Sequence, residues 1–317
     1  TDFTSIFQAY YLPEALEKAI PLTILNQFGQ KNQLKKGQWS TVVDWIQPND
    51  PTSGDVVTLT QGSQYATASG TVTVAAVSGS MILYGCSTTI SNILDATAGI
   101  NFMEHCEEHV SDSIAIKVDD LIRTEIATGT ATVDRYPTAL GTNAFANLNS
   151  GTGATTTIKT QDILYATTNL RINKAKDFGG KGYMAACSPQ VMADVLSDNA
   201  FINVTAYQAA ERTFNAEAGK IAGATLVWHN NPFIEGTVEN TYNSSGSIFS
   251  TMVFGKNSYG VVDMSMFQMR PSVNVLAEAD KFDIYNMNLT TAATFYFATK
   301  VLRGNWIVNL RSKVNYS

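Results

Sequence analysis

The sequence predicts an α+β protein in which extended segments project from a body of helices and strands. Apolar residues recur at helical spacing through much of residues 88–128, which predicts one unusually long helix. Residues 48–80 combine β-propensity with almost no large side chains, which predicts a thin two-stranded ribbon. Residues 248–317 hold several apolar runs of strand length, which predicts a terminal sheet. A chain of 317 residues has room for about two compact units beside such extensions.

The N-terminal residues 1–30 have the pattern of a short amphipathic arm. Pro13 suits the first turn of a helix, Leu16 and Ile20 follow at helical spacing, and Pro21 stops or kinks that helix. The arm offers an apolar face but has too few residues to build a core of its own. We therefore expect it to pack against other protein.

A strand is expected at residues 38–47, and a dense turn cluster at 48–55 ends it. Two thin runs, Val56–Thr60 and Thr71–Val77, are followed by a stronger one at Ser80–Tyr84. A two-stranded ribbon is marginally stable alone, and arms of about 14 residues reach roughly 45 Å at 3.3 Å per residue. We expect the ribbon to protrude and to become ordered on a neighbouring molecule.

The helix expected within residues 88–128 carries a wide apolar stripe. Gly99 divides a first segment of about ten residues from a main piece of about 28 residues, which spans roughly 42 Å at 1.5 Å per residue. Gly129 is a natural terminator just past the last helical turn. The stripe comprises Met103, Cys106, Val110, Ile114, Lys117/Val118, Leu121 and Glu125, widened by Ile93, Ile100, Ile116, Ile122 and Ile126. Such a length exceeds that of an average globular helix and predicts a spine across a flat domain.

Helices and strands alternate over roughly 160–255, which predicts a small α/β unit. A helix is expected to start at Thr160, and Tyr183–Cys187 has the composition of a short buried strand. Ser188 followed by a proline predicts a capped helix start. Ala224–Trp228 is a further strand candidate.

The C-terminal part is expected to be rich in strands. The candidates are Ile248–Gly255, Tyr259–Val262, Phe267–Leu276, Phe295–Leu302 and Trp306–Leu310. The last two runs are joined by Arg303-Gly304-Asn305, and this spacing predicts a hairpin.

Composition and charge exclude several classes of protein. No run approaches about 18 apolar residues, so no membrane span is expected. The 21 basic and 27 acidic residues give a net charge of −6 without basic blocks, which argues against a dedicated nucleic-acid binder. Cys86, Cys106 and Cys187 lie far apart and form neither a zinc-knuckle spacing nor a disulfide framework. Charged residues make up only 15 % of the chain, as suits surfaces that face other protein.

One motif points to catalysis. His105-Cys106-Glu107-Glu108-His109 matches the inverted zinc-hydrolase pattern H-x-x-E-H, and on a helix the two histidines would share a face. A zinc site needs a third ligand, and the only other histidine is His229. The alternative interpretation, which we favour, is a solvated acidic edge of the long helix. No phosphate-loop or dinucleotide-binding fingerprint is present, so we assign no catalytic, cofactor-binding or metal residues and expect no enzyme.

Five segments occur in an order that carries a resemblance. They are Leu25–Gln30, Thr58–Gly62, Met184–Leu196, Glu217–Gly223 and Phe254–Val262. With them the chain resembles the major capsid proteins of tailed bacteriophages, and more narrowly the podovirus-type major head protein family, whose fold is shared with encapsulins and the herpesvirus capsid floor. The last segment is the closest match, a G-x-x-A/S-Y-G-V-V strand and turn. Gln61 stands where the family usually has Glu, and Ser188 where it has His.

This resemblance implies the tailed-phage major capsid protein fold in four parts. Residues 1–40 would form the N-terminal arm, and 41–86 the extended loop, a β-ribbon. Residues 87–159 and 256–317 would form a peripheral domain holding the spine helix, and 160–255 an axial α/β domain. Axial domains of this family meet at the centres of hexamers and pentamers.

The function implied by the resemblance is structural. Homo-pentamers and homo-hexamers would assemble into an icosahedral phage head around double-stranded DNA, which the shell would touch non-specifically. Implied partners are the portal and scaffold or decoration proteins, and implied locations are the virion and, during assembly, the host cytoplasm. Two alternatives stay open: an encapsulin-like compartment shell, and a cytoplasmic zinc hydrolase built on His105, Glu108 and His109.

Overall fold

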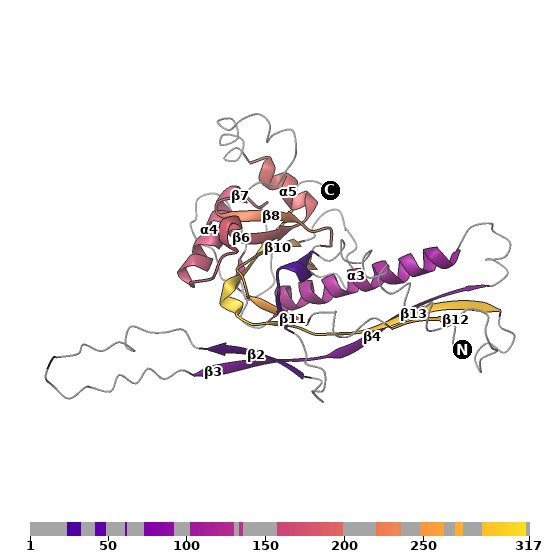
Figure 1. The fold of residues 1–317 in the computed structure, drawn as a ribbon. Helices are drawn as coiled ribbons and strands as arrows, with labels where there is room; N and C mark the ends of the chain where they lie inside the picture. The colour runs from indigo at the N-terminus through magenta and orange to yellow at the C-terminus, as the bar shows by residue number, and fades with distance from the viewer. Residues whose placement is uncertain are drawn as a thin grey trace.

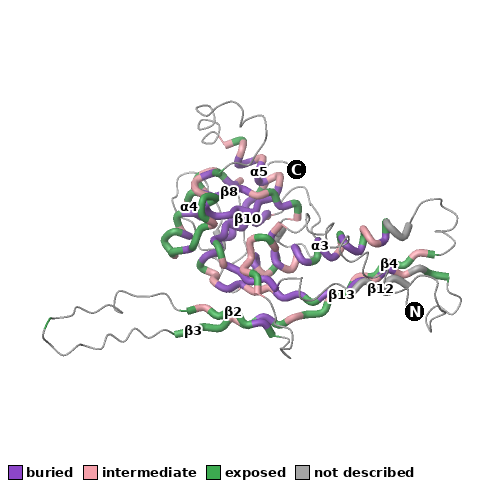
Figure 2. The backbone as a smooth tube through the Cα atoms, in the orientation of Figure 1, coloured by how far each residue is buried: buried purple, intermediate pink, exposed green. Residues whose placement is uncertain are grey.

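An elongated base carries a helix-and-sheet unit above one of its ends, and a two-stranded ribbon extends from the base beyond that same end (Figure 1). In this computed structural model the described residues are 24–32, 42–48, 61, 73–91, 102–129, 133–135, 157–198, 220–231, 233–235, 248–262, 270–274 and 287–314. Buried residues are concentrated inside the helix-and-sheet unit and beneath the long helix of the base, whereas most described residues of the ribbon are exposed (Figure 2).

The upper unit, called the α/β unit below, is built on a seven-stranded sheet in the order β5-β15-β10-β6-β8-β7, with β9 paired to β10. The strands are β5 (Val133–Arg135), β6 (Tyr183–Cys187), β7 (Lys220–Ile221), β8 (Ala224–Trp228), β9 (Phe233–Glu235), β10 (Ile248–Phe254) and β15 (Ile307–Ser312). Helices α4 (Thr160–Ile172) and α5 (Pro189–Leu196) belong to the same unit. The sheet thus takes strands from both sides of the 160–255 range.

Both faces of this sheet are buried. Every residue of β6 is buried, and its side chains divide between two cores. Ala185 and Cys187 join α4 and α5 in one core, whereas Met184 and Ala186 join helix α3 (Phe102–Thr128) in the other. A strand covered on both faces needs an unbroken apolar run rather than alternation, which explains the sequence Tyr-Met-Ala-Ala-Cys.

The base consists of α3 lying on a three-stranded sheet. The sheet order is β12 (Arg270–Asn274), β13 (Asn288–Phe297) and β4 (Ile82–Ser91), all antiparallel. Side chains of β13 alternate: Ala293, Phe295 and Phe297 are buried against α3, while Thr294 and Tyr296 are exposed. One face of this sheet is therefore covered and the other faces outward.

Two smaller sheets complete the described chain. The 3-10 turn η2 (Leu25–Gln27) leads into β1 (Gln30–Asn32), which pairs in parallel with β11 (Tyr259–Val262), and β11 pairs with β14 (Thr299–Val301). The ribbon consists of β2 (Val42–Pro48) and β3 (Val74–Ser80), paired antiparallel along their whole length.

Most elements with a strong local signal are confirmed. The main piece of the long helix has 27 residues and ends at Thr128, just before Gly129. A Cβ atom at Gly129 would lie 2.6 Å from Val301 Cγ2, so the glycine permits close approach of β14. The helix from Thr160 and the strands Tyr183–Cys187 and Ala224–Trp228 lie where expected. Ser188 caps α5 by accepting a hydrogen bond from Val191 N.

The predicted C-terminal hairpin is wrong. β14 pairs with β11, and β15 pairs with β10 and β5 in the other sheet. Between them the 3-10 turn η6 (Gly304–Trp306) turns the chain, while the amides of Leu302 and Arg303 both donate to Ser258 O. These bonds and the hydrogen bond from Trp306 Nε1 to Asn173 O fix residues 302–306, which connect one sheet to the other.

Two expectations for the helical region are also wrong. Residues 88–91 belong to β4, because β13 offers a ten-residue pairing partner that the local pattern does not reveal. Ile116 is 54 % exposed instead of widening the stripe, since it lies about 200° around the helix from the buried Ile114. Gly99 and the segment 92–101 lie outside the described residues.

The described end of the arm rests on its own subunit, contrary to expectation. Leu25 is fully buried among α3 and β11, and the Phe28 ring packs 5.8 Å from Phe178 and 5.9 Å from Phe254 between centroids. Residues 1–23, which hold the expected amphipathic helix, lie outside the described residues, as do most residues between 49 and 72.

Candidate functional site

The ribbon has two faces of different character, because successive side chains on a strand point to opposite sides. We call the face formed by Val42, Asp44, Ile46, Pro48, Val74, Ala76, Ser78 and Ser80 the outer ribbon face, and the opposite face the inner ribbon face. The inner face fastens the ribbon to the body, and the outer face is available to another molecule.

Trp45 anchors the inner ribbon face. It is 2 % exposed and packs with Val43, Val262, Ala298 and Leu302. The indole fits only because glycines lie on both sides: a Cβ at Gly79 would come within 2.8 Å of it, and a Cβ at Gly260 within 2.4 Å. The ribbon is therefore held against the body at its root by close packing around Trp45.

Beyond this anchor the ribbon stands away from the body. A groove of about 450 Å³ opens between the ribbon and the turn that holds η6. Gln47 and Ala75 line it on the ribbon side, and Arg303, stacked 4.3 Å over the Trp306 ring, lines it on the body side.

All eight residues of the outer ribbon face are exposed. Three are large and apolar: Val42 is 38 %, Val74 58 % and Ile46 70 % exposed. Asp44 is the only charged residue of the eight. An apolar surface with so little charge has the composition of a protein interface.

Exposed apolar residues also occur on the base. Ile82 and Leu83, at the start of β4, are each 54 % exposed, and Tyr296, opposite Leu83 on β13, is 41 % exposed.

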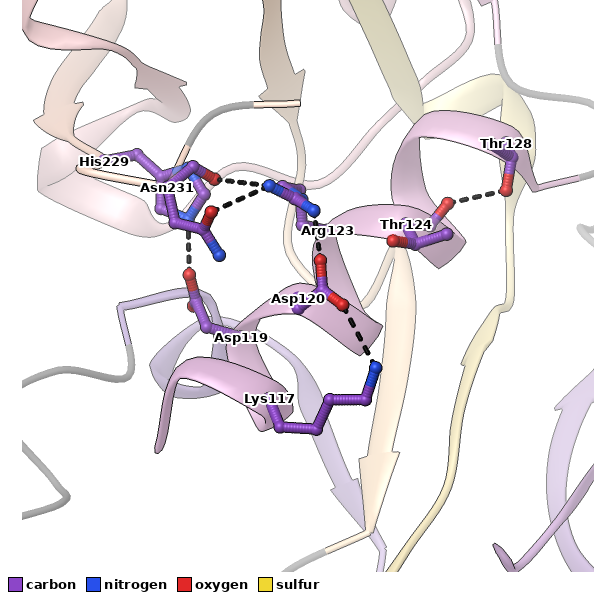
Figure 3. Close-up of polar contacts among 8 residues, drawn as sticks. All are labelled: Lys117, Asp119, Asp120, Arg123, Thr124, Thr128, His229 and Asn231. Carbon is purple, nitrogen blue, oxygen red and sulfur yellow. Dashed lines mark hydrogen bonds and ion pairs between the residues drawn. The ribbon is translucent and has the colours of Figure 1, made fainter. Parts of the chain in front are cut away.

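A second site is a buried polar cluster between α3 and the α/β unit (Figure 3). His229 Nε2 and Asp119 Oδ2 are 2.5 Å apart, with their side chains 3 % and 4 % exposed. Asp119 Oδ1 accepts a hydrogen bond from Leu25 N at 3.2 Å, and Leu25 O accepts one from Tyr259 Oη at 2.6 Å. Burial, and then the charge of Asp119, hold the pKa of Tyr259 well above its ordinary value, so its hydroxyl stays a donor.

One helical turn further along α3, Arg123 extends this cluster. Its guanidinium donates to Asn231 O at 3.3 Å and to Asn231 Oδ1 at 2.8 Å, and it is ion-paired with Asp120. Burial lowers the pKa of Arg123, while Asp120 and Asp119 oppose that shift. Two turns of α3 thus hold residues 229–231, the connection between β8 and β9.

The H-x-x-E-H residues are not arranged as a zinc site. The side chain of His105 is 63 % and that of Glu108 43 % exposed, with 3.6 Å between His105 Nδ1 and Glu108 Oε2. His109 is exposed and lies 3.4 Å from Thr88 Oγ1. His229, the other histidine, is hydrogen-bonded through Nε2 to Asp119 Oδ2. Among the described residues no group of three or more His, Cys, Asp or Glu side chains could hold a metal ion.

Sequence reasoning missed the buried cluster. From the sequence alone, His229 is a candidate only as a zinc ligand, and Asp119 carries no signal of its own. Their separation of 110 residues leaves no periodic signal.

No helix of the described chain is long and apolar enough to cross a membrane.

Solved structures with the same fold exist, although neither a protein-family model nor a curated protein matches the sequence. The capsid of cyanophage P-SCSP1u has a TM-score of 0.64 at 12 % identity and covers 92 % of this chain and 89 % of its own. The head of Helicobacter pylori bacteriophage KHP40 has a TM-score of 0.64 at 8 % identity, covering 86 % and 85 %. The chain has the major capsid protein fold of tailed phages.

The capsid fold extends beyond phages. A virus-like particle from Pyrococcus furiosus has a TM-score of 0.50 at 8 % identity and covers 96 % of this chain and 99 % of its own. At these identities the likeness concerns the fold, and the α+β class and the resemblance inferred from sequence are confirmed at that level.

Proposed function

We propose that this chain is the major capsid protein of a tailed bacteriophage. Pentamers and hexamers of it would assemble into an icosahedral head around double-stranded DNA. The capsid fold, shared over 92 % of the chain with a cyanophage capsid, is the observation that carries the proposal. The exposed outer ribbon face supports it independently, because it is a surface without a covering layer from the described chain.

The physical argument starts from the ribbon. Ile46 and Val74 lie in water in the single chain, and burying one such side chain contributes about 1.5–3 kcal/mol. If the ribbon of each copy lies on the next copy, the contact is heterologous and can close into a ring. A closed lattice multiplies weak contacts through avidity, so each one can be modest.

The four parts implied by the resemblance belong to this proposal: arm 1–40, extended loop 41–86, peripheral domain 87–159 with 256–317, and axial domain 160–255. Portal, scaffold and decoration proteins are the expected partners. DNA contacts would be non-specific, since the net charge of −6 offers no basic surface block. The role is structural rather than catalytic, and the protein would reside in the virion after assembly in the host cytoplasm.

A compartment shell without a genome is the second candidate. The likeness to the Pyrococcus furiosus virus-like particle, which covers 99 % of that chain, is the observation that favours it. The two candidates differ in content: a phage head is filled with DNA, whereas a compartment shell would hold protein cargo.

Electron microscopy and analytical ultracentrifugation of the purified full chain test the shell function. Large particles of uniform diameter are expected. A stable monomer or small oligomer at all concentrations would overturn the proposal. Nuclease-protected DNA in particles isolated from their natural source would favour the phage head, and co-purified protein cargo without DNA would favour the compartment.

A further inference from the structure

The α/β unit contacts helix α3 through an apolar surface that does not by itself define an angle. Met184, Ala186 and Met252 of the sheet pack against Ile114 and other residues of α3 in one shared core. Hydrophobic contacts are non-directional, so packed elements of this kind can slide or rotate between alternative arrangements. A fixed angle requires directional bonds.

Two sets of directional bonds join the unit to α3, and they lie at different points along the helix. The first is the Asp119–His229 pair with the Arg123–Asn231 bonds one turn later (Figure 3). The second lies at the C-terminal end of α3, where Asn309 Nδ2 donates to Ile126 O at 3.2 Å. Asp119 and Ile126 are seven residues apart, or about 10 Å at 1.5 Å per residue. Two ties at this separation prevent rotation about either one.

Both residues of the Asp119–His229 pair are also held by backbone hydrogen bonds to other elements. His229 N donates to Cys187 O at 2.9 Å, which fastens His229 to the end of β6. Asp119 holds the amide of Leu25, and Tyr259 holds the carbonyl of that residue. The pair therefore connects the sheet of the unit, the spine helix and the end of the N-terminal arm.

A buried pair of polar or ionised side chains adds little stability, because the cost of removing both groups from water offsets most of their attraction. Such a pair is directional, however, whereas apolar side chains in its place would not fix an angle. We infer that the Asp119–His229 pair, with Arg123–Asn231, is a joint that sets the angle between the α/β unit and α3. Resting on the proposed function, this angle would determine the curvature of the shell and hence its diameter.

The angle can be measured on the dissociated full chain, independently of assembly. Spin labels at Asp112→Cys on α3 and Thr168→Cys on α4, both exposed positions, are placed in a Cys86→Ser background. Double electron–electron resonance then gives the distribution of distances between them. A single narrow distribution is expected for the otherwise unaltered chain.

The decisive variant is Asp119→Asn with His229→Leu, in which the Asn side chain still accepts from Leu25 N. We expect the distance distribution to broaden or to gain a second maximum. If this variant does not fold, Asn231→Ala removes the side-chain bond to Arg123, keeps the bond to Asn231 O, and is expected to broaden the distribution less. Thr167→Val is the matched control, because Thr167 is buried and bonds to Ala222 O within the unit.

A folded joint variant whose distance distribution equals that of the unaltered chain would overturn the inference, as would equal broadening in the Thr167→Val control. Particle diameter is the second readout: joint variants are expected to give shifted or mixed diameters, and the control a single unchanged diameter. If the unaltered chain forms no particles, the proposed function fails, while the distance measurement still decides whether the joint sets the angle.

Discussion

The α/β unit and the ribbon are both built from strands, yet they satisfy their apolar side chains in opposite ways. In the unit, β6 is buried at every residue because helices of the same chain cover both faces of the sheet. In the ribbon, β2 alternates between buried and exposed residues, and the exposed face includes Ile46 at 70 %. Figure 2 shows the contrast as a largely buried upper unit and a largely exposed ribbon.

This difference indicates a division of labour. The unit has a core covered on both faces of its sheet by helices of the described chain, whereas the ribbon has an anchor at its root and an exposed outer face. Neighbouring residues of one strand therefore differ: Trp45 is buried in the folded chain, whereas Ile46 is exposed and, under the proposed function, would contact another copy.

The largest expected effect follows from placing a charge on the outer ribbon face. Ile46→Asp should abolish particle formation, because the carboxylate would have to be desolvated in the subunit contact. The free energy of unfolding of the isolated chain should change by no more than about 0.5 kcal/mol, as for other exposed positions. Ile46→Val is the control and should assemble normally. Normal particles of Ile46→Asp would contradict the role of this face.

Substitutions at the Trp45 anchor should lower the stability of the ribbon root, whereas Ile46→Asp should affect assembly alone. Gly260→Ala would place a methyl group 2.4 Å from the Trp45 ring, so the ring must leave its site. Trp45→Ala removes the same packing and should cost about 3–5 kcal/mol of local stability. Limited proteolysis should cut both variants within the ribbon while the α/β unit stays intact. Gly180→Ala, where nothing lies within 4 Å, should behave as the unaltered chain.

A smaller effect distinguishes Cys187 of the α/β unit from Cys86 of the base. Burial raises the pKa of the Cys187 thiol in the unit to about 12, and the thiolate is the reactive form. Iodoacetamide at neutral pH should therefore modify Cys187 only after unfolding, and the half-buried Cys86 of β4 before it. Mass spectrometry of peptides taken during the reaction gives both rates; equal rates in the folded chain would show that the sheet around Cys187 opens readily.

The fold could be predicted from sequence where the signal is local. The periodicity of α3, the Ser188-Pro189 cap of α5 and the apolar run of β6 each lie within a short window. The pairing of β4 with β13 could not be predicted, because Thr89 and Thr290 are 201 residues apart. The same holds for β15, whose hairpin-like spacing from β14 conceals a change of sheet.

The candidate sites also differ in how far local sequence could predict them. Composition predicted a charge-poor ribbon within 48–80, of which β3 is described, but not that its partner is β2. The division into an anchored and an exposed face depends on the glycines at 79 and 260 that admit Trp45. The Asp119–His229 pair needs the tertiary fold to exist at all. Helical spacing predicted a shared face for His105 and His109 but could not supply a third ligand.

Protection of residue 46 on assembly tests the central claim most directly. In a Cys86→Ser background, Ile46→Cys is treated with a polar maleimide, once as dissociated subunits and once as particles, with the buried position Val43→Cys as the control that reacts slowly in both. The account predicts rapid labelling at position 46 in the subunit and strong protection in the particle. Equal labelling rates in the two states would contradict it.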